Sequence, residues 1–249
     1  MNNFTNGQIV ELRKLEEAYT KSGSPGFRAK VQELIDRLKA GVDPPDTPAP
    51  FLVQSRALWN YGWGWRVDFK KLDEYRKSLE QEGLPVTPER PAGMPDHLNR
   101  LVLWDQRPFL VKKKGKQRVF LEKACRLLRV KLVGGEDNIR QHEATPQVTA
   151  LVHWVWCQDG RRNQNRRPSD CRQSFVPPEV GLEAIGGLFL VAQDPTVIRG
   201  HSMYLPGSAR RDYPSVCLDL VWVAGSGPCL FLGMGDIAYS ECGSASRWE

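Results

Sequence analysis

The chain has 249 residues, a hydrophobic fraction of 41% and a charged fraction of 26%. That composition is typical of a globular protein and excludes disorder over the whole chain. No apolar run approaches the roughly 20 residues of a membrane-spanning helix, and residues 1–7 lack the basic and apolar stretches of a secretory signal. We therefore expect a cytoplasmic protein with no membrane partner.

The positive charge is concentrated in the middle of the chain. Residues 101–167 hold 15 Lys and Arg against 6 Asp and Glu, a balance of +9, whereas residues 168–249 hold 5 against 9. A local concentration of one sign favours an anionic partner more than the same charge spread evenly would.

Six cysteines stand at positions 125, 157, 171, 217, 229 and 242, and no two have C-x-x-C spacing. Without a secretory signal, this usage indicates reduced thiols. The spacing supports neither a zinc ribbon nor a redox motif, so we expect no metal site and no cofactor.

Two amphipathic helices are predicted at the start of the chain. Apolar residues recur at helical spacing over 8–19 and again over 27–38, with Gly41 as a stop signal. This predicts a helical hairpin over residues 1–42. Four prolines within residues 43–50 predict a linker, and an α+β domain follows over 51–249, with a second Pro-rich connection at 84–95. A strand at 51–53 and a helix at 68–82 lie between the two Pro-rich segments.

The second half of the chain mixes strands and helices. We predict strands at 107–114 and 148–156, and helices at 117–129, 169–175 (with Ser169 as the N-cap) and 179–193. Strands at 216–224 and 229–234 flank a turn at 225–228 and predict a β-hairpin. Because regular βαβ alternation is missing, the fold class is α+β: a helical N-terminal lobe, then a mixed, mostly antiparallel sheet with packed helices and a C-terminal β-hairpin.

Two basic runs are the candidate binding residues. The first is predicted at a strand-to-helix turn and contains Lys112, Lys113, Lys114, Lys116 and Arg118. The second follows a strand and contains Arg161, Arg162, Arg166 and Arg167. Arg forks bind phosphate in a bidentate manner, so both runs together predict a surface for nucleic acid or another polyanion. Solvated loops that only aid solubility are the alternative.

An aromatic run contains Trp59, Tyr61, Trp63 and Trp65, which share one face in an extended chain. Exposed rings would stack bases or form a patch for a protein partner, whereas buried rings would cover a hydrophobic core. The sequence leaves all three interpretations open.

A cysteine-dependent enzyme, a hydrolase or transferase of unknown substrate, is the second functional hypothesis. Cys171 is predicted in the first turn of a helix beside Arg172, which lowers a thiol pKa. Cys229 follows a Gly-Ser-Gly-Pro turn, and His201 is the candidate base. No local signature accompanies these residues, and buried structural cysteine is the alternative.

An ordered set of short motifs spans roughly residues 150–247. It includes Asp170-Cys171-Arg172, Gly181-Leu182-Glu183-Ala184, Leu205-Pro206-Gly207-Ser208, Pro228-Cys229-Leu230 and Gly243-Ser244-Ala245-Ser246. This pattern resembles a family of uncharacterised bacterial proteins and, more distantly, an actinobacterial family of unknown function. The resemblance implies a helix, a Leu-Pro-Gly-Ser turn, a late strand pair and a Gly-Ser-Ala-Ser end. It implies no activity, cofactor or catalytic residue.

The leading functional hypothesis is therefore a non-enzymatic protein that binds an anionic partner, nucleic acid foremost, through its basic centre. A cysteine-dependent enzyme and a protein-interaction module are the alternatives.

Overall fold

The computed structural model describes residues 74, 77, 78, 81, 83, 88–113, 116–119, 121–143, 145, 146, 150–233 and 235–249. The chain divides into two compact units, Met1–Pro48 and Ala49–Glu249, and every described residue belongs to the second. The helical hairpin and linker predicted over 1–50 and the strand at 51–53 lie outside the described residues and stay predictions. Of the helix predicted at 68–82, the described residues 74, 77, 78 and 81 are helical.

Four antiparallel strands form the first sheet, in the order β1–β6–β12–β7. Their bounds are Arg100–Asp105, Val152–Gln158, Ser246–Trp248 and Glu179–Gly181. The edge of β1 is closed by a side chain: Gln193 accepts a hydrogen bond from the Leu103 N–H (3.2 Å) and donates one to the Leu103 carbonyl (2.9 Å). The amide thus takes the place of a neighbouring strand at this edge.

The second sheet has the order β11–β8–β9–β10–β4, and β5 also pairs with β8. In that order the bounds are Cys242–Ser244, Ser202–Arg210, Cys217–Val223, Gly227–Phe231 and Lys131–Val133, with β5 at Ile139–Gln141. Only the β11–β8 and β10–β4 pairs are parallel among the described strands. The predicted α+β class with mostly antiparallel strands is confirmed, but the described strands divide into separate sheets where the sequence predicted one. The predicted hairpin is confirmed as β9–β10, although β11 and β12 follow it in the chain.

A separate hairpin, β2–β3, carries the first basic run. It pairs Leu110–Lys113 with Lys116–Val119 in antiparallel register. The prediction of a strand over 107–114 is half right, since η1, a 3-10 helix, occupies Arg107–Phe109. The prediction of a helix over 117–129 is wrong at its start, because α5 spans only Leu121–Leu127. Long charged side chains suit an exposed helix and an exposed strand equally, so the pattern did not fix the boundary.

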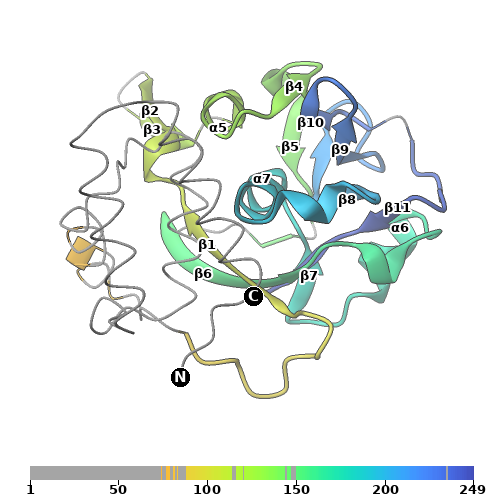
Figure 1. The fold of residues 1–249 in the computed structure, drawn as a ribbon, viewed down its shortest axis with the longest axis horizontal. Helices are drawn as coiled ribbons and strands as arrows, with labels where there is room; N and C mark the ends of the chain where they lie inside the picture. Colours follow the sequence, from red (N-terminus) through yellow and green to blue (C-terminus); the bar gives the residue numbers. More distant parts are fainter. Residues whose placement is uncertain are drawn as a thin grey trace, which may run out of the picture. The chain divides into compact units, whose positions relative to one another are not determined.

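Helix α7, Ala184–Gln193, lies between the two sheets (Figure 1). The predicted helix over 179–193 starts too early, because residues 179–181 form β7. Ala184 and residues 186–192 are all buried, as expected for a helix that is apolar all round. A methyl group built on Gly186 would lie 2.2 Å from the Trp104 ring of β1, and one on Gly187 would lie 2.5 Å from Leu205 of β8. The two glycines therefore let both sheets approach the helix closely.

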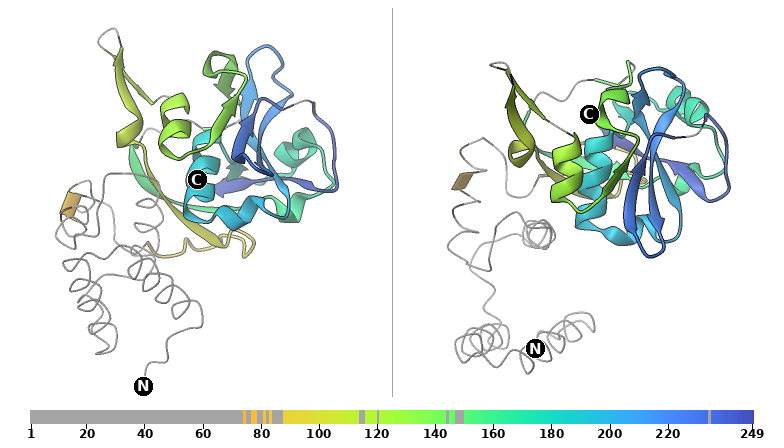
Figure 2. Two further views of the ribbon diagram at one scale, coloured as in Figure 1. Left: turned by 45° about the horizontal axis from the view of Figure 1, so that its top comes forward. Right: turned by 90° about the horizontal axis from the view of Figure 1, so that it is seen from above.

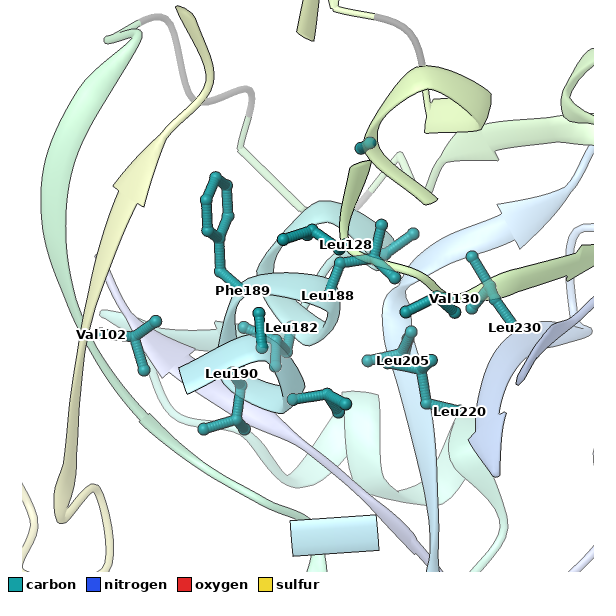
Figure 3. Close-up of a cluster of buried hydrophobic side chains, with 14 of the residues drawn as sticks. Val102, Leu128, Val130, Leu182, Leu188, Phe189, Leu190, Leu205, Leu220 and Leu230 are labelled. Atoms are coloured by element: carbon teal, nitrogen blue, oxygen red, sulfur yellow. The ribbon is translucent and has the colours of Figure 1, made fainter. Parts of the chain in front are cut away.

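The hydrophobic core surrounds this helix (Figure 3). Leu188 and Phe189 of α7 pack with Leu128 beyond the end of α5, while Leu205 and Leu220 come from the second sheet. Val102 contributes from the first sheet. One continuous cluster thus joins both sheets through the central helix.

The Gly-Ser-Ala-Ser segment carries the chain from one sheet to the other. β11 and β12 are separated only by Ala245, whose N–H donates to the Tyr204 carbonyl (2.9 Å) and whose carbonyl accepts from the Leu182 N–H (3.1 Å). The expected Leu-Pro-Gly-Ser turn is wrong, since residues 205–208 lie inside β8 at a register shift. A strand with a bulge is what lets Pro206 and Gly207 sit within a sheet.

Two further predicted elements are found with shifted bounds. The strand predicted at 148–156 is β6, and the helix predicted at 169–175 is α6, Pro168–Ser174. Arg167, not Ser169, is the N-cap residue of α6. In the described part of the chain, no helix combines the length and apolarity needed to cross a membrane.

Candidate functional site

The second basic run forms the loop between β6 and α6. We call residues 161–167 the arginine loop; it begins with the 3-10 helix η3, Arg161–Asn163. Arg161, Arg162, Arg166 and Arg167 are exposed, whereas Asn163 is buried. The loop contains no acidic residue. Four exposed cations therefore stand on one short stretch of backbone.

The turn into the arginine loop is tightly built. Gly160 adopts a left-handed conformation (φ 92°) that favours glycine. Its N–H donates to the Gln158 side-chain oxygen (2.5 Å), and the Gln158 amide donates to the Ser244 carbonyl and the Ser246 hydroxyl, both at 2.9 Å. The end of β6 is thereby fixed to the crossing between β11 and β12.

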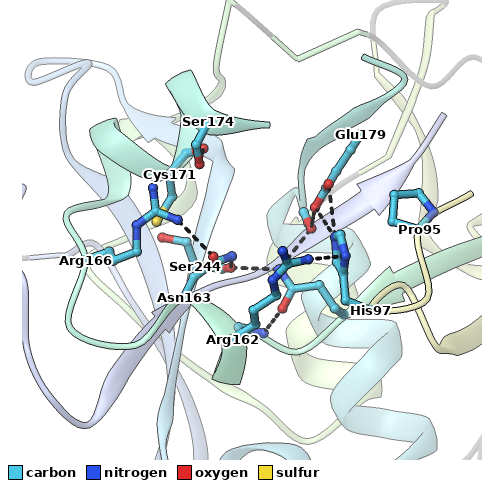
Figure 4. A network of polar contacts seen from close by, with 12 residues as sticks. Pro95, His97, Arg162, Asn163, Arg166, Cys171, Ser174, Glu179 and Ser244 are labelled. Atoms are coloured by element: carbon cyan, nitrogen blue, oxygen red, sulfur yellow. Dashed lines mark hydrogen bonds and ion pairs between the residues drawn. The ribbon is translucent and has the colours of Figure 1, made fainter. Parts of the chain in front are cut away.

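The body of the loop is held from inside by Asn163 (Figure 4). Its side-chain amide donates to the Ser244 carbonyl (2.8 Å), and its side-chain oxygen accepts from the Arg166 guanidinium (3.3 Å). Asn165 has a positive φ of 58° and donates its N–H to the Tyr239 carbonyl (3.0 Å). These contacts set the loop conformation through neutral acceptors, so they do not neutralise the charge of Arg166.

His201, the predicted base, supports the arginine loop. It is buried, and its Nε2–H donates to the Asp159 carbonyl (2.7 Å). Its Nδ1 accepts a hydrogen bond from the Arg161 Nε (3.4 Å). With both ring nitrogens occupied, His201 positions the start of the loop and has no nitrogen left for a nucleophile.

The carboxylate nearest the loop is already paired. Asp159 accepts from the Arg100 guanidinium (2.9 Å) and from the Arg161 N–H (3.2 Å). Arg100 also bonds Asp194 at 2.7 Å. The Arg161 guanidinium also pairs with Asp159 at the longer distance of 3.8 Å. Asp159 is therefore shared between Arg100 and one of the four loop arginines, so the loop keeps a net positive charge.

A second chain of contacts reaches the loop through Arg162 (Figure 4). The buried Glu179 carboxylate accepts a hydrogen bond from the Ser246 hydroxyl and lies 3.0 and 3.1 Å from Nε2 of His97. The other ring nitrogen of His97 faces the Arg162 guanidinium. Sequence reasoning missed His97 and Glu179, which are 82 residues apart and belong to no local motif.

The predicted cysteine nucleophiles are both buried. Cys171 lies in α6, where burial raises the pKa of its thiol and the nearby Ser244 hydroxyl offsets only part of that effect. Cys229 lies in β10, with its thiol 3.7 Å from the Gly227 carbonyl. A catalytic cysteine needs a lowered pKa and access to substrate. Neither residue is brought to His201 by a described contact, so the geometry gives no support to the cysteine-dependent enzyme.

The first basic run lies elsewhere. Lys112 and Lys113 belong to β2, Lys116 and Arg118 to β3, and Lys114 is outside the described residues. Figures 1 and 2 place this hairpin and α6, which directly follows the arginine loop, on opposite sides of α7. The two basic runs therefore do not form the single surface that the sequence predicted.

The aromatic run and the metal ligands were also considered in the sequence. The aromatic residues Trp59, Tyr61, Trp63 and Trp65 lie outside the described residues, so their exposure stays untested. Among the described His, Cys, Asp and Glu side chains, no group of three or more is arranged to hold a metal ion.

No protein-family model, curated protein or solved structure matches the chain.

Proposed function

We propose that the protein binds a polyanion, nucleic acid in particular, through the arginine loop. The observation that carries this proposal is a set of four exposed arginines on a backbone fixed by Gly160 and by the buried Asn163. A loop that is already ordered loses little backbone entropy when it binds, so more of the contact energy appears as affinity. Arg is suited to the task because its planar fork matches phosphate oxygens.

A chain of phosphates fits this loop better than a single small anion. The loop offers four guanidinium groups within seven residues, and the adjacent carboxylate, Asp159, is shared between Arg100 and Arg161. Each phosphate that the arginines neutralise releases counterions, which gives binding to a nucleic acid its dependence on salt. With about four contacts to a single strand, the affinity falls ~50-fold between about 50 and 200 mM salt.

The proposed contact set is smaller than the sequence alone suggested. It comprises Arg161, Arg162, Arg166 and Arg167, and it leaves out the basic residues of the β2–β3 hairpin, which lie on the other side of α7. The hairpin is a separate surface, and the proposal does not require it.

The test is a titration of a fluorescein-labelled oligonucleotide with the full-length protein, followed by fluorescence anisotropy over a range of salt concentrations. In one variant, Arg166→Gln and Arg167→Gln remove two exposed charges from the loop. We expect weaker binding and a salt slope reduced by about 0.7 to 0.9 per lost phosphate contact.

The matched control removes the same charge elsewhere. Arg126 of α5 and Arg211 after β8 are both exposed, and the double variant Arg126→Gln with Arg211→Gln is expected to bind as the parent protein does. Binding that does not weaken with salt, or that is lost equally in both double variants, would overturn the proposal.

A further inference from the structure

An exposed tyrosine lies beside the arginine loop. Tyr239 belongs to the connection between β10 and β11, and 39% of its surface is exposed. Its carbonyl oxygen accepts hydrogen bonds from the N–H groups of Asn165 (3.0 Å) and Cys242 (3.1 Å). Because Asn165 belongs to the arginine loop, one of these hydrogen bonds joins the Tyr239 backbone directly to that loop.

The segment that carries this ring is anchored at several points. The Asp236 carboxylate accepts from the Ser169 N–H (2.9 Å) and from the Ser169 hydroxyl, at the first turn of α6. The Tyr204 hydroxyl donates to the Ile237 carbonyl (3.2 Å). An aromatic side chain held on a fixed backbone makes a better stacking surface than one on a loop that must first be ordered.

The electrostatic balance around the ring remains positive. The connection contributes two carboxylates, Asp236 and the exposed Glu241, of which Asp236 is engaged by Ser169 and Glu241 accepts from the Ser240 hydroxyl (2.8 Å). Asp170, exposed in the first turn of α6 beside Ser169, adds a third carboxylate. The arginine loop contributes four positive charges against these three. An anionic strand is therefore attracted to the patch formed by the arginine loop and Tyr239.

We propose that the ligand is single-stranded nucleic acid, with one base stacked on the Tyr239 ring while the arginine loop holds neighbouring phosphates. This inference rests on the proposed function and names its substrate class. Bases within a duplex are already stacked on each other, so a surface ring gains a base only from an unpaired strand. Positive charge combined with an exposed aromatic ring is how proteins bind single strands without reading sequence.

The experiment compares labelled oligothymidylate with a duplex of the same length, using anisotropy at one fixed salt concentration. Loss of one stacked base weakens single-strand binding about 5- to 150-fold, and this is the effect expected for Tyr239→Ala. Duplex binding, which depends on phosphate contacts alone, is unchanged in that variant. Tyr239→Phe retains the ring and binds both ligands as the parent does.

A second exposed tyrosine gives the control. Tyr213 is 59% exposed and packs against the Arg210 guanidinium (5.1 Å from the ring centroid), away from the arginine loop in the sequence. Tyr213→Ala removes an arginine-associated ring from the surface and is expected to leave single-strand binding unchanged. Urea unfolding of each variant checks that the fold is intact.

An abasic strand separates stacking from charge. It keeps the phosphates and lacks the bases, so the parent protein binds it as weakly as Tyr239→Ala binds oligothymidylate, and Tyr239→Ala causes no further loss. Equal parent affinity for abasic and intact strands, or no effect of Tyr239→Ala while the Arg166/Arg167 variant loses binding, would refute the stacking inference and leave the proposed function standing. If no nucleic acid binds and an acidic peptide does, the stacking inference and the assignment of nucleic acid as the polyanion both fail, and the patch belongs to a protein partner.

Discussion

Gly160 and Gly243 are packed against each other at the base of the arginine loop, each filling the space where the other's side chain would be. A methyl group built on Gly243 would lie 2.0 Å from the Gly160 carbonyl oxygen, and one built on Gly160 would lie 2.2 Å from the Gly243 carbonyl oxygen. Real Cβ atoms do not approach an oxygen this closely, so neither position accepts alanine without a backbone shift. The contact joins the start of the arginine loop to β11.

We expect Gly243→Ala to destabilise the protein by about 1–3 kcal/mol, the usual cost of inserting a methyl group into a packed site. Gly160→Ala adds about 1–2 kcal/mol, since its left-handed φ of 92° penalises any Cβ. Urea unfolding at equilibrium measures both. Because the clash lies at the loop, we also expect both variants to bind labelled oligonucleotide more weakly under conditions where they are folded.

Gly200 provides the matched control for these variants. Nothing lies within 4 Å of a methyl group built on it, and its φ is not in the left-handed region. Gly200→Ala is expected to be neutral or to stabilise by about 0.4–1 kcal/mol, because alanine reduces the entropy of the unfolded chain. A urea midpoint for Gly243→Ala equal to that of Gly200→Ala would show that the glycine contact does not constrain the loop.

How much the sequence predicts depends on how local each feature is. The arginine loop was found because its four charges lie within seven residues, and most of α7 because its apolar residues recur at helical spacing. Strand β8 was missed because Pro206 and Gly207 are typical turn residues, and only the partners of β8 make them a bulge within a strand. The His97–Glu179 pair was missed for the same reason, since tertiary structure alone brings the two together.

The first basic run was found in the sequence, but its position relative to the arginine loop was predicted wrongly. Its charges were read directly from the sequence, but their relation to the arginine loop depends on which side of α7 each run lies. A charge count along the chain contains no such information. The sequence therefore predicted the composition of a basic surface and not its division into two.

Asp219 makes folding less favourable as pH rises. Burial in β9 raises the pKa of its carboxyl to about 6, and the backbone of Gly233 offsets only part of that rise. The folded state holds this proton to a higher pH than the unfolded state does, so stability falls between about pH 4 and about pH 6. Above about pH 6, the free energy of unfolding is lower by about 3 kcal/mol than it is below about pH 4. Asp219→Asn, which carries no charge, is expected to stabilise the protein by up to that amount near neutral pH.

Unfolding free energies of Asp219→Asn and the parent protein, measured in urea at a series of pH values, check this. The two curves converge below about pH 4, where the parent carboxyl becomes protonated in both states, and separate as pH rises. Asp212→Asn is the control, because its carboxylate is exposed at the surface, where it pairs with Arg210. A variant that is no more stable than the parent at neutral pH would contradict the prediction.

The cysteines are expected to react slowly in the folded protein. All six are buried, and burial raises the thiol pKa of Cys125 and of Cys157 to about 12. Since the thiolate is the reactive form, alkylation by iodoacetamide near neutral pH should modify none of them readily until urea unfolds the chain. Mass spectrometry of the labelled peptides identifies each site. A single cysteine that reacts quickly in the folded protein, Cys171 above all, would revive the cysteine-dependent enzyme.

His153 gives a dependence on pH of the opposite sign to that of Asp219. Burial lowers the pKa of the imidazole of His153, a residue of β6, to about 4, and the Arg247 guanidinium adds to the effect. An unfolded histidine takes up its proton near pH 6.5, whereas the folded one stays neutral until about pH 4. Stability therefore falls by about 3 kcal/mol as pH drops through that range. In the parent, the ring centroids of His153 and Trp104 are 4.9 Å apart in an edge contact. His153→Phe keeps a ring at this position and removes the titrating imidazole.

Relative to the parent, His153→Phe should gain stability below about pH 6.5 and hold a constant difference above it. Asp219→Asn should gain stability relative to the parent as pH rises. The unfolding free energies of the two variants therefore diverge from that of the parent at opposite ends of the same pH range. In the parent the two groups oppose each other between about pH 4 and about pH 6, which flattens its pH profile over that interval. A difference between His153→Phe and the parent that stays constant from neutral pH down to about pH 4 would mean that His153 is protonated at the same pH in the folded and unfolded states.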